Sequence, residues 1–245
     1  MKVIVTGGYE DSCRAAADMI VAQVRTDPAS KLGLATGGTA EGVYAALVSA
    51  YRRGEVSFSG VSTVNLDEYR GLAPDDPQSY HSYMNRLFFD LVDIDRAHTY
   101  VPSGTRDADE EIALFREKLT KGRPIDIQLL GIGVSGHIGF NEPGAYLASG
   151  VHIERLHKST VESNARFFEK PEDVPVTAIT MGVGDIMKAR SIVLVAAGKA
   201  KAAAMRSLLM DGKITTQVPA TVLKMHPDVT VVIDRELADE IGFTG

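Results

Sequence analysis

The hydrophobic pattern of the chain alternates short apolar runs rich in β-branched residues with longer stretches whose apolar residues recur every three or four positions. Short runs bounded by turn residues predict strands, and the longer pattern predicts amphipathic helices. The clearest helix is predicted at 107–121, where Ala108, Ile112, Phe115 and Leu119 fall on one face. Strands are predicted at 3–6, 32–35, 62–66, 127–130, 178–181, 192–196 and 230–233.

This alternation predicts a three-layer α/β/α fold, in which helices cover both faces of a Rossmann-like, mostly parallel sheet of about seven strands. No internal repeat, low-complexity tract or linker divides the 245 residues, so a single domain spanning 1–245 is expected. The longest interruption, at about 140–177, is rich in Gly, Pro, Asn and charge. Such a segment is typical of a lid or of an ordinary surface insertion.

Composition and charge narrow the class of protein. Hydrophobic residues make up 44% and charged residues 24%, as in ordinary soluble globular proteins. A net charge of −6 without any run of Lys or Arg argues against nucleic-acid binding. The opening residues lack a signal-peptide pattern, and no segment reaches the roughly 18 apolar residues of a membrane span. Cys13 is the single cysteine and is predicted to pack in the core, so the protein is expected to be cytoplasmic.

The densest group of candidate chemical residues lies at 126–144, where an apolar run leads into a glycine-rich loop. The G-x-G-x-x-G pattern that begins at Gly131 matches a dinucleotide fingerprint, which also requires a helix directly afterwards. Pro143 and an inner glycine disfavour that helix, so a nicotinamide site is not expected. His137 is instead a candidate acid/base, because histidine titrates near neutral pH, and Glu142 is placed to orient it.

Two further segments place polar residues directly after predicted strands. At Gly37, Gly38 and Thr39 a glycine turn precedes a helix, which predicts an anion site or a plain strand–helix turn. No Lys-Ser/Thr pair follows, so a phosphate on a small molecule fits better than a nucleotide. Asp67 and Glu68 follow the next strand, either as a polar turn or as a base. Neighbours on an extended chain point in opposite directions, so only one of them can face a ligand.

Arg166 and Lys201 are candidates for positive charge at an anion, although by themselves they are typical solvated helix residues. No group of His, Cys, Asp and Glu has metal-ligand spacing, so no metal is expected. The other histidines lack a comparable setting and are interpreted as structural: His81, His98, His152, His157 and His226.

Taken together, these segments resemble the glucosamine-6-phosphate deaminase family, also called glucosamine-6-phosphate isomerases. The resemblance covers nearly the whole chain and rests on ATGGT at 35–39, NLDEY at 65–69, GIGVSGHIGFNEP at 131–143, NARFF at 164–168 and GKAK at 198–201. The related 6-phosphogluconolactonases share the fold and a GGT-like loop. They usually carry Asp-Glu-Arg at 67–69 and a Ser-Leu-Phe-Pro-like run at 140–143, where this chain differs.

The resemblance implies conversion of glucosamine 6-phosphate into fructose 6-phosphate and ammonia, in amino-sugar (N-acetylglucosamine) catabolism and without a cofactor. It implies that Asp67 moves a proton between C2 and C1 of the opened sugar through an enolamine. His137 would open the pyranose ring, and Glu142 and the residue at the position of Ser135 would orient it. The phosphate would be held by Gly37, Gly38, Thr39, Arg166 and Lys201.

Two departures from the family pattern concern rate and regulation. Family members usually have Asp or Asn where this chain has Ser135, so His137 is expected to be less strongly biased toward its protonated form. Activity is expected to survive with an altered rate or pH profile. Allosteric hexameric members bind N-acetylglucosamine 6-phosphate through a basic pair, for which this chain has His152 and Glu154. A monomer or small homo-oligomer without an allosteric site is therefore expected.

Three alternative functions stay open: a galactosamine-6-phosphate deaminase, a 6-phosphogluconolactonase and a sugar-phosphate-sensing domain of a transcription regulator. Such regulator domains adopt a similar fold but are free to lose the acid/base residues. Asp67, His137 and Glu142 are all present here, which favours an enzyme.

Overall fold

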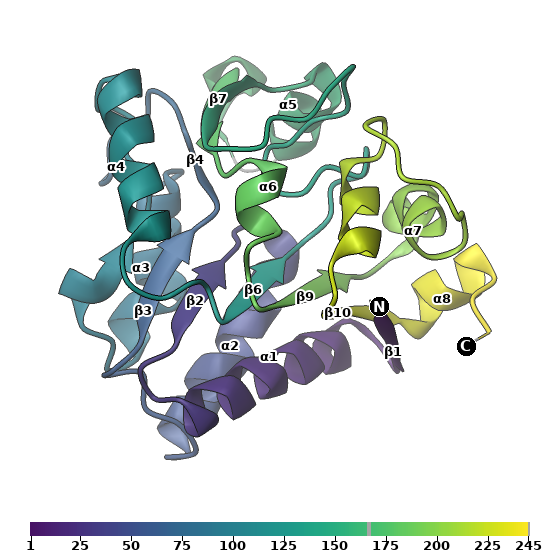
Figure 1. The fold of residues 1–245 in the computed structure, drawn as a ribbon, viewed down its shortest axis with the longest axis horizontal. Coiled ribbons are helices and arrows are strands. Elements are labelled where there is room, and N and C mark those ends of the chain that lie inside the picture. Colours follow the sequence, from purple (N-terminus) through teal and green to yellow (C-terminus); the bar gives the residue numbers. More distant parts are fainter. Residues whose placement is uncertain (166–167, 245) are drawn as a thin grey trace.

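The main sheet has seven parallel strands in the order β1-β10-β9-β6-β2-β3-β5, in a computed structural model that describes residues 1–165 and 168–244 (Figure 1). Strands β2, β6 and β10 are buried along their whole length, which requires helices on both faces of the sheet. The strands are β1 Lys2–Thr6, β2 Lys31–Leu34, β3 Ser62–Asn65, β5 Thr99–Tyr100, β6 Ile127–Leu130, β9 Ser191–Ala196 and β10 Val229–Asp234.

Helices cover this sheet, and α1 packs against α2 as well as against β9 and β10. The helix predicted at 107–121 is observed as α4, and Asp107 caps it by accepting two N–H groups of its first turn. Cys13 of α1 is buried in the core, as predicted. In the described part of the chain, no helix combines the length and apolar character needed to cross a membrane. The helices are α1 Tyr9–Thr26, α2 Gly38–Arg52, α3 Tyr80–Leu87, α4 Ala108–Thr120, α5 Lys158–Asn164, α6 Val183–Ile186, α7 Ala202–Leu209 and α8 Arg235–Ile241.

A second, antiparallel sheet has three strands in the order β4-β8-β7. Figure 1 shows β7 and α5 at the top, on the side toward which β2 and β6 point. The strands are β4 Asp67–Tyr69, β7 His152–Arg155 and β8 Thr177–Thr180. The strand predicted at 178–181 is observed as β8, but it pairs antiparallel with β4 and β7 and therefore lies outside the parallel sheet. The seventh place is taken by β5, whose two residues are too few to give a hydrophobic pattern.

The chain passes from the main sheet to the second sheet at Leu66. The N–H of Leu66 donates to the carbonyl of Leu34 in β2, and its carbonyl accepts from the N–H of Met181 directly after β8. Asp67 is the next residue and pairs in register with Thr180. The fold therefore places Asp67 where the two sheets meet.

Glu68, the neighbour of Asp67, has a structural role. Its fully buried carboxylate accepts the backbone N–H groups of Tyr80 and His81 at the start of α3, and that of Tyr69 in β4. Negative charge at this end of a helix is also favoured by the helix dipole. Of the two adjacent carboxylates, Asp67 is therefore the one left for a ligand.

Candidate active site

The predicted site residues follow the carboxyl ends of four neighbouring strands. In the sheet order β9-β6-β2-β3, Lys201 comes after β9, the loop 131–142 after β6, the turn 37–39 after β2 and Asp67 after β3. Parallel neighbours present these ends along one edge of the sheet, so the structure brings these segments to the same side. Arg166 lies outside the described residues.

His137 has three oxygen atoms around one ring nitrogen. Its Nδ1 lies 3.1 Å from Oγ of Ser135, 3.3 Å from Oε2 of Glu142 and 3.5 Å from Oγ1 of Thr160. Because a carboxylate only accepts hydrogen bonds, these neighbours favour the neutral tautomer with its proton on Nδ1. Nε2 makes no hydrogen bond to any described residue and is the nitrogen left for a substrate.

Glu142 is almost fully buried, yet it remains ionised. Burial acts to raise its pKa, but interactions with His137, Thr160 and His157 outweigh burial and leave the pKa below its usual value. The N–H of His157 lies 3.4 Å from Oε1. The negative charge of Glu142 can therefore stabilise positive charge on His137.

The glycine loop after β6 makes room for the His137 ring. A Cβ atom added at Gly133 would lie 2.2 Å from Nε2 and Cε1 of His137, so only glycine fits there. The N–H of Gly133 donates to the carbonyl of His137, and the N–H of Gly136 donates to that of Gly133. No helix follows this loop over 131–144, which confirms that the glycine pattern is not a dinucleotide fingerprint.

Asp67 is a buried carboxylate that accepts no hydrogen bond from any described residue, and only 5% of the residue is exposed. Burial raises the pKa of Asp67 to about 8, and the negative charge of Glu68 acts in the same direction. A carboxyl group with a pKa near the working pH can both take up and return a proton. Asp67 therefore has the properties of a general base.

The loop that carries His137 passes directly beside Asp67. A Cβ atom added at Gly139 would lie 3.3 Å from Oδ2 of Asp67. The N–H of Phe140 donates to Oγ1 of Thr180, the register partner of Asp67. Phe140 also belongs to a small buried apolar cluster, with Tyr69, Leu156 and Ala178. The loop and this cluster therefore lie beside the strand that begins with Asp67, whose burial raises its pKa.

Two residues that contact the acid/base pair have no signal in the sequence. Thr160 and His157 lie at the start of α5, and Nδ1 of His157 is 4.0 Å from Oε2 of Glu142. Sequence patterns do not reveal these contacts, because they depend on how the segment after Glu142 folds back. His157 therefore lies beside the site, whereas its sequence setting suggested only a structural role.

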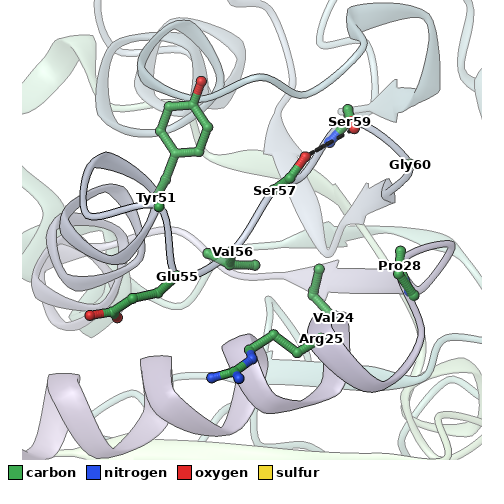
Figure 2. A pocket seen from close by; sticks show the side chains of 10 residues that line it. Val24, Arg25, Pro28, Tyr51, Glu55, Val56, Ser57, Ser59 and Gly60 are labelled. Carbon is green, nitrogen blue, oxygen red and sulfur yellow. Dashed lines mark hydrogen bonds between the residues drawn. The ribbon is translucent and has the colours of Figure 1, made fainter.

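The surface pocket drawn in Figure 2 lies away from these residues. It has a volume of about 420 Å³ and is lined by residues near the ends of α1 and α2 and by the segment 54–60, which precedes β3. None of the predicted site residues lines it. The candidate site is therefore defined by its strand ends and polar contacts, not by this pocket.

The raised pKa of Asp67 predicts a pH-dependent difference in stability between the wild type and Asp67→Asn. Between the unfolded pKa of about 3.9 and the folded pKa of about 8, the folded wild type holds a proton that the unfolded chain has released. Its free energy of unfolding should therefore fall relative to that of Asp67→Asn as the pH rises, by a few kcal/mol in all, and then level off.

Urea unfolding from pH 5 to pH 9 measures this difference. Asp75→Asn, which changes an exposed aspartate, is the matched control and should follow the wild type in parallel. A constant offset between the wild type and Asp67→Asn over this range would show that the pKa is not raised.

Comparison with known proteins supports a family assignment. The family model for glucosamine-6-phosphate isomerases/6-phosphogluconolactonase matches residues 9–232. A glucosamine-6-phosphate deaminase of Thermoanaerobacter pseudethanolicus is 48% identical over 242 residues, which cover 98% of this chain and 95% of that protein. One of Clostridium perfringens is 46% identical over 239 residues, covering 97% of this chain and 98% of that protein.

Comparison with solved structures supports the same family assignment. One, described as a monomeric glucosamine-6-phosphate deaminase of the NagB superfamily, has a TM-score of 0.95 and 43% identity, with coverage of 98% of this chain and 100% of that chain. A 6-phosphogluconolactonase from Leishmania guyanensis has a TM-score of 0.77 and 19% identity, with 98% of each chain covered, which shows a shared fold alone. From its sequence, its fold and these relatives, the chain belongs to the glucosamine-6-phosphate deaminase family.

Proposed function

We propose that this protein converts D-glucosamine 6-phosphate and water into D-fructose 6-phosphate and ammonia, as a glucosamine-6-phosphate deaminase of amino-sugar metabolism. Identities of 48% and 46% to deaminases over nearly the full length support this activity. The observation that carries the mechanism is the buried, unpaired carboxylate of Asp67 beside the loop that holds His137.

The phosphate of the substrate binds at the turn 37–39, where Lys201 adds positive charge. The support is that both follow strand ends on the edge of the sheet that carries Asp67. The family resemblance adds Arg166 as a further phosphate ligand. Holding the phosphate at one end orients C1 and C2 of the sugar toward Asp67, so binding energy from a remote group promotes the reaction.

His137 opens the pyranose ring. Its Nε2 takes the proton of the anomeric hydroxyl and returns a proton to the ring oxygen as the bond between C1 and that oxygen breaks, which leaves an aldehyde at C1. Ionised Glu142, 3.3 Å from Nδ1, stabilises the imidazolium between the two transfers. Ser135 places a neutral hydroxyl 3.1 Å from Nδ1, which offers a hydrogen-bond partner but no charge.

Asp67 then isomerises the open sugar. It removes the proton from C2, the electron pair moves toward the aldehyde, and the aldehyde oxygen takes a proton from water to give an enolamine. Return of the first proton from Asp67 to C1 leaves a protonated imine at C2, which gives its extra proton back to the solvent as it is hydrolysed. Water adds to this imine, the C–N bond breaks, and ammonia leaves fructose 6-phosphate. The carbonyl and amine of the substrate act as electron sink and leaving group, so these steps call for no cofactor.

We further propose that residues 1–245 form a single domain in which the segment at about 140–177 is a lid. Thr160 and His157 support this reading, because both lie in this segment and contact the pair formed by His137 and Glu142. A segment that contacts the acid/base residues in this way can exclude water once the substrate is bound.

The purified protein should release ammonia and fructose 6-phosphate from glucosamine 6-phosphate, with both products measured by enzyme-coupled assays. Asp67→Asn preserves the shape of the side chain but cannot accept the C2 proton, so kcat should fall by about 10²- to 10⁴-fold. Asp75→Asn, at an exposed position, should retain full activity.

The same assay on galactosamine 6-phosphate tests the sugar preference. Faster turnover of galactosamine 6-phosphate would reassign the substrate while keeping the reaction. A wild-type rate no greater than that of Asp67→Asn on both sugars would rule out the proposed function.

We propose that the enzyme is a monomer or small oligomer without allosteric activation. The likeness to a structure described as a monomeric deaminase supports this, as does Glu154, whose Oε2 lies 3.1 Å from Nε2 of His152. A carboxylate at this position repels a phosphate. Velocity should therefore rise hyperbolically with glucosamine 6-phosphate and stay unchanged on addition of N-acetylglucosamine 6-phosphate. Sigmoidal kinetics relieved by that compound would contradict this expectation.

A further inference from the structure

Three tyrosine hydroxyls from three helices hold the carbonyl groups of the turn after β2. Tyr44 of α2 donates to the carbonyl of Ala35 at 2.5 Å, and Tyr83 of α3 donates to that of Gly37 at 2.9 Å. Tyr9 of α1 donates to the carbonyl of Gly38 at 2.9 Å and lies 3.3 Å from that of Thr39. The carbonyl side of this turn is therefore fixed by side chains from three helices, and two of these side chains, Tyr9 and Tyr83, are distant in sequence.

Tyr9 also enters the first turn of α2. Its hydroxyl accepts the N–H of Gly42 at 3.1 Å while it donates to Gly38, and these two residues are spaced like i, i+4 partners in a helix. A Cβ atom added at Gly42 would lie 2.8 Å from this hydroxyl and 2.6 Å from Sγ of Cys13, so glycine makes the approach of α1 possible. Burial raises the pKa of Tyr9 to about 12, which keeps the hydroxyl a donor.

Fixing these carbonyls also fixes the amides on the other side of the same peptide groups. In a trans peptide, the C=O of one residue and the N–H of the next point in opposite directions. The bond from Tyr83 to Gly37 therefore directs the N–H of Gly38, and the bond from Tyr9 to Gly38 directs that of Thr39. In the described part of the chain, no acceptor pairs with these two N–H groups or with the Thr39 hydroxyl.

We infer that Tyr9 and Tyr83 are positioning residues that aim the amides of Gly38 and Thr39 at the phosphate of the substrate. This inference rests on the proposed function, which assigns the turn 37–39 to the phosphate. Preorganised N–H groups at a helix start bind an anion without first reorienting the backbone. The two hydroxyls act through backbone groups of the turn, so their removal should weaken binding and leave the chemical step unchanged.

Tyr9→Phe and Tyr83→Phe remove one hydroxyl each and retain the ring. Each should raise KM for glucosamine 6-phosphate and the inhibition constant of inorganic phosphate by about three- to tenfold, the effect of one hydrogen bond, with kcat unchanged. Thr39→Val is the positive control, since it removes a direct donor to the phosphate. Tyr9 is 37% exposed, so Tyr9→Phe carries the test alone if Tyr83→Phe is unstable.

Tyr51→Phe is the matched negative control. Tyr51 lies on α2 about 20 Å along the helix from the turn and lines the pocket of Figure 2. Its hydroxyl makes no hydrogen bond to a described residue, so this variant should match the wild type in every constant.

The outcomes separate the inference from the proposed function. Weaker phosphate binding in Tyr9→Phe but not in Tyr51→Phe supports the positioning role. Wild-type constants in both Tyr9→Phe and Tyr83→Phe, with weakened binding in Thr39→Val, would overturn it and leave the deaminase activity standing. A fall in kcat at unchanged KM would also overturn it. Absence of wild-type activity would refute the proposed function, and calorimetric titration of inorganic phosphate into Tyr9→Phe would still test the positioning role.

Discussion

Asp67 lies where the chain leaves the parallel sheet and enters the antiparallel one, with only 5% of the residue exposed and no hydrogen-bond donor among the described residues. A carboxylate in water is a weak base, whereas burial raises the pKa of Asp67 to about 8. The topology makes this possible because the adjacent Glu68 is used to cap α3, so one carboxylate supports the fold and the other is free for chemistry. The small apolar cluster includes residues of the second sheet and of the loop that passes beside Asp67.

The other parts of the site have different electrostatic environments, and each environment follows from the local structure. The turn 37–39 presents unpaired amides at the start of α2, which suits an anion. The loop after β6 pairs His137 with ionised Glu142, which suits a group that becomes positive for part of the reaction. Three electrostatic environments thus lie at neighbouring strand ends of one sheet: a donor-rich turn, a histidine hydrogen-bonded to an ionised glutamate, and a desolvated base. A rigid sheet holds them apart at fixed separations, which matches a substrate that carries its phosphate far from the reacting carbons.

Much of the main sheet could be predicted, because buried parallel strands are continuous apolar runs, and the strand at 127–130 coincides with β6. The second sheet could not, since β4 and β7 are short and polar and β8 resembles a main-sheet strand. For the candidate site, the sequence motifs pointed to Asp67, His137 and the turn 37–39 but gave no sign that Glu68 caps a helix. Contacts such as that of Tyr9 with Gly38 join residues far apart in sequence, so no local pattern contains them. Lys201 follows β9 in the chain, and the order of the strands in the sheet puts it on the same edge as the other candidate residues.

The central claim is that one buried carboxylate moves the proton between C2 and C1 from a single face of the sugar. The most direct measurement is to convert glucosamine 6-phosphate in D2O and analyse C1 of the fructose 6-phosphate by proton NMR. A desolvated base predicts that the incoming hydrogen occupies only one of the two positions on C1, with a measurable share of the original C2 hydrogen retained. Deuterium spread equally over both positions, with no C2 hydrogen retained, would contradict the assignment of Asp67.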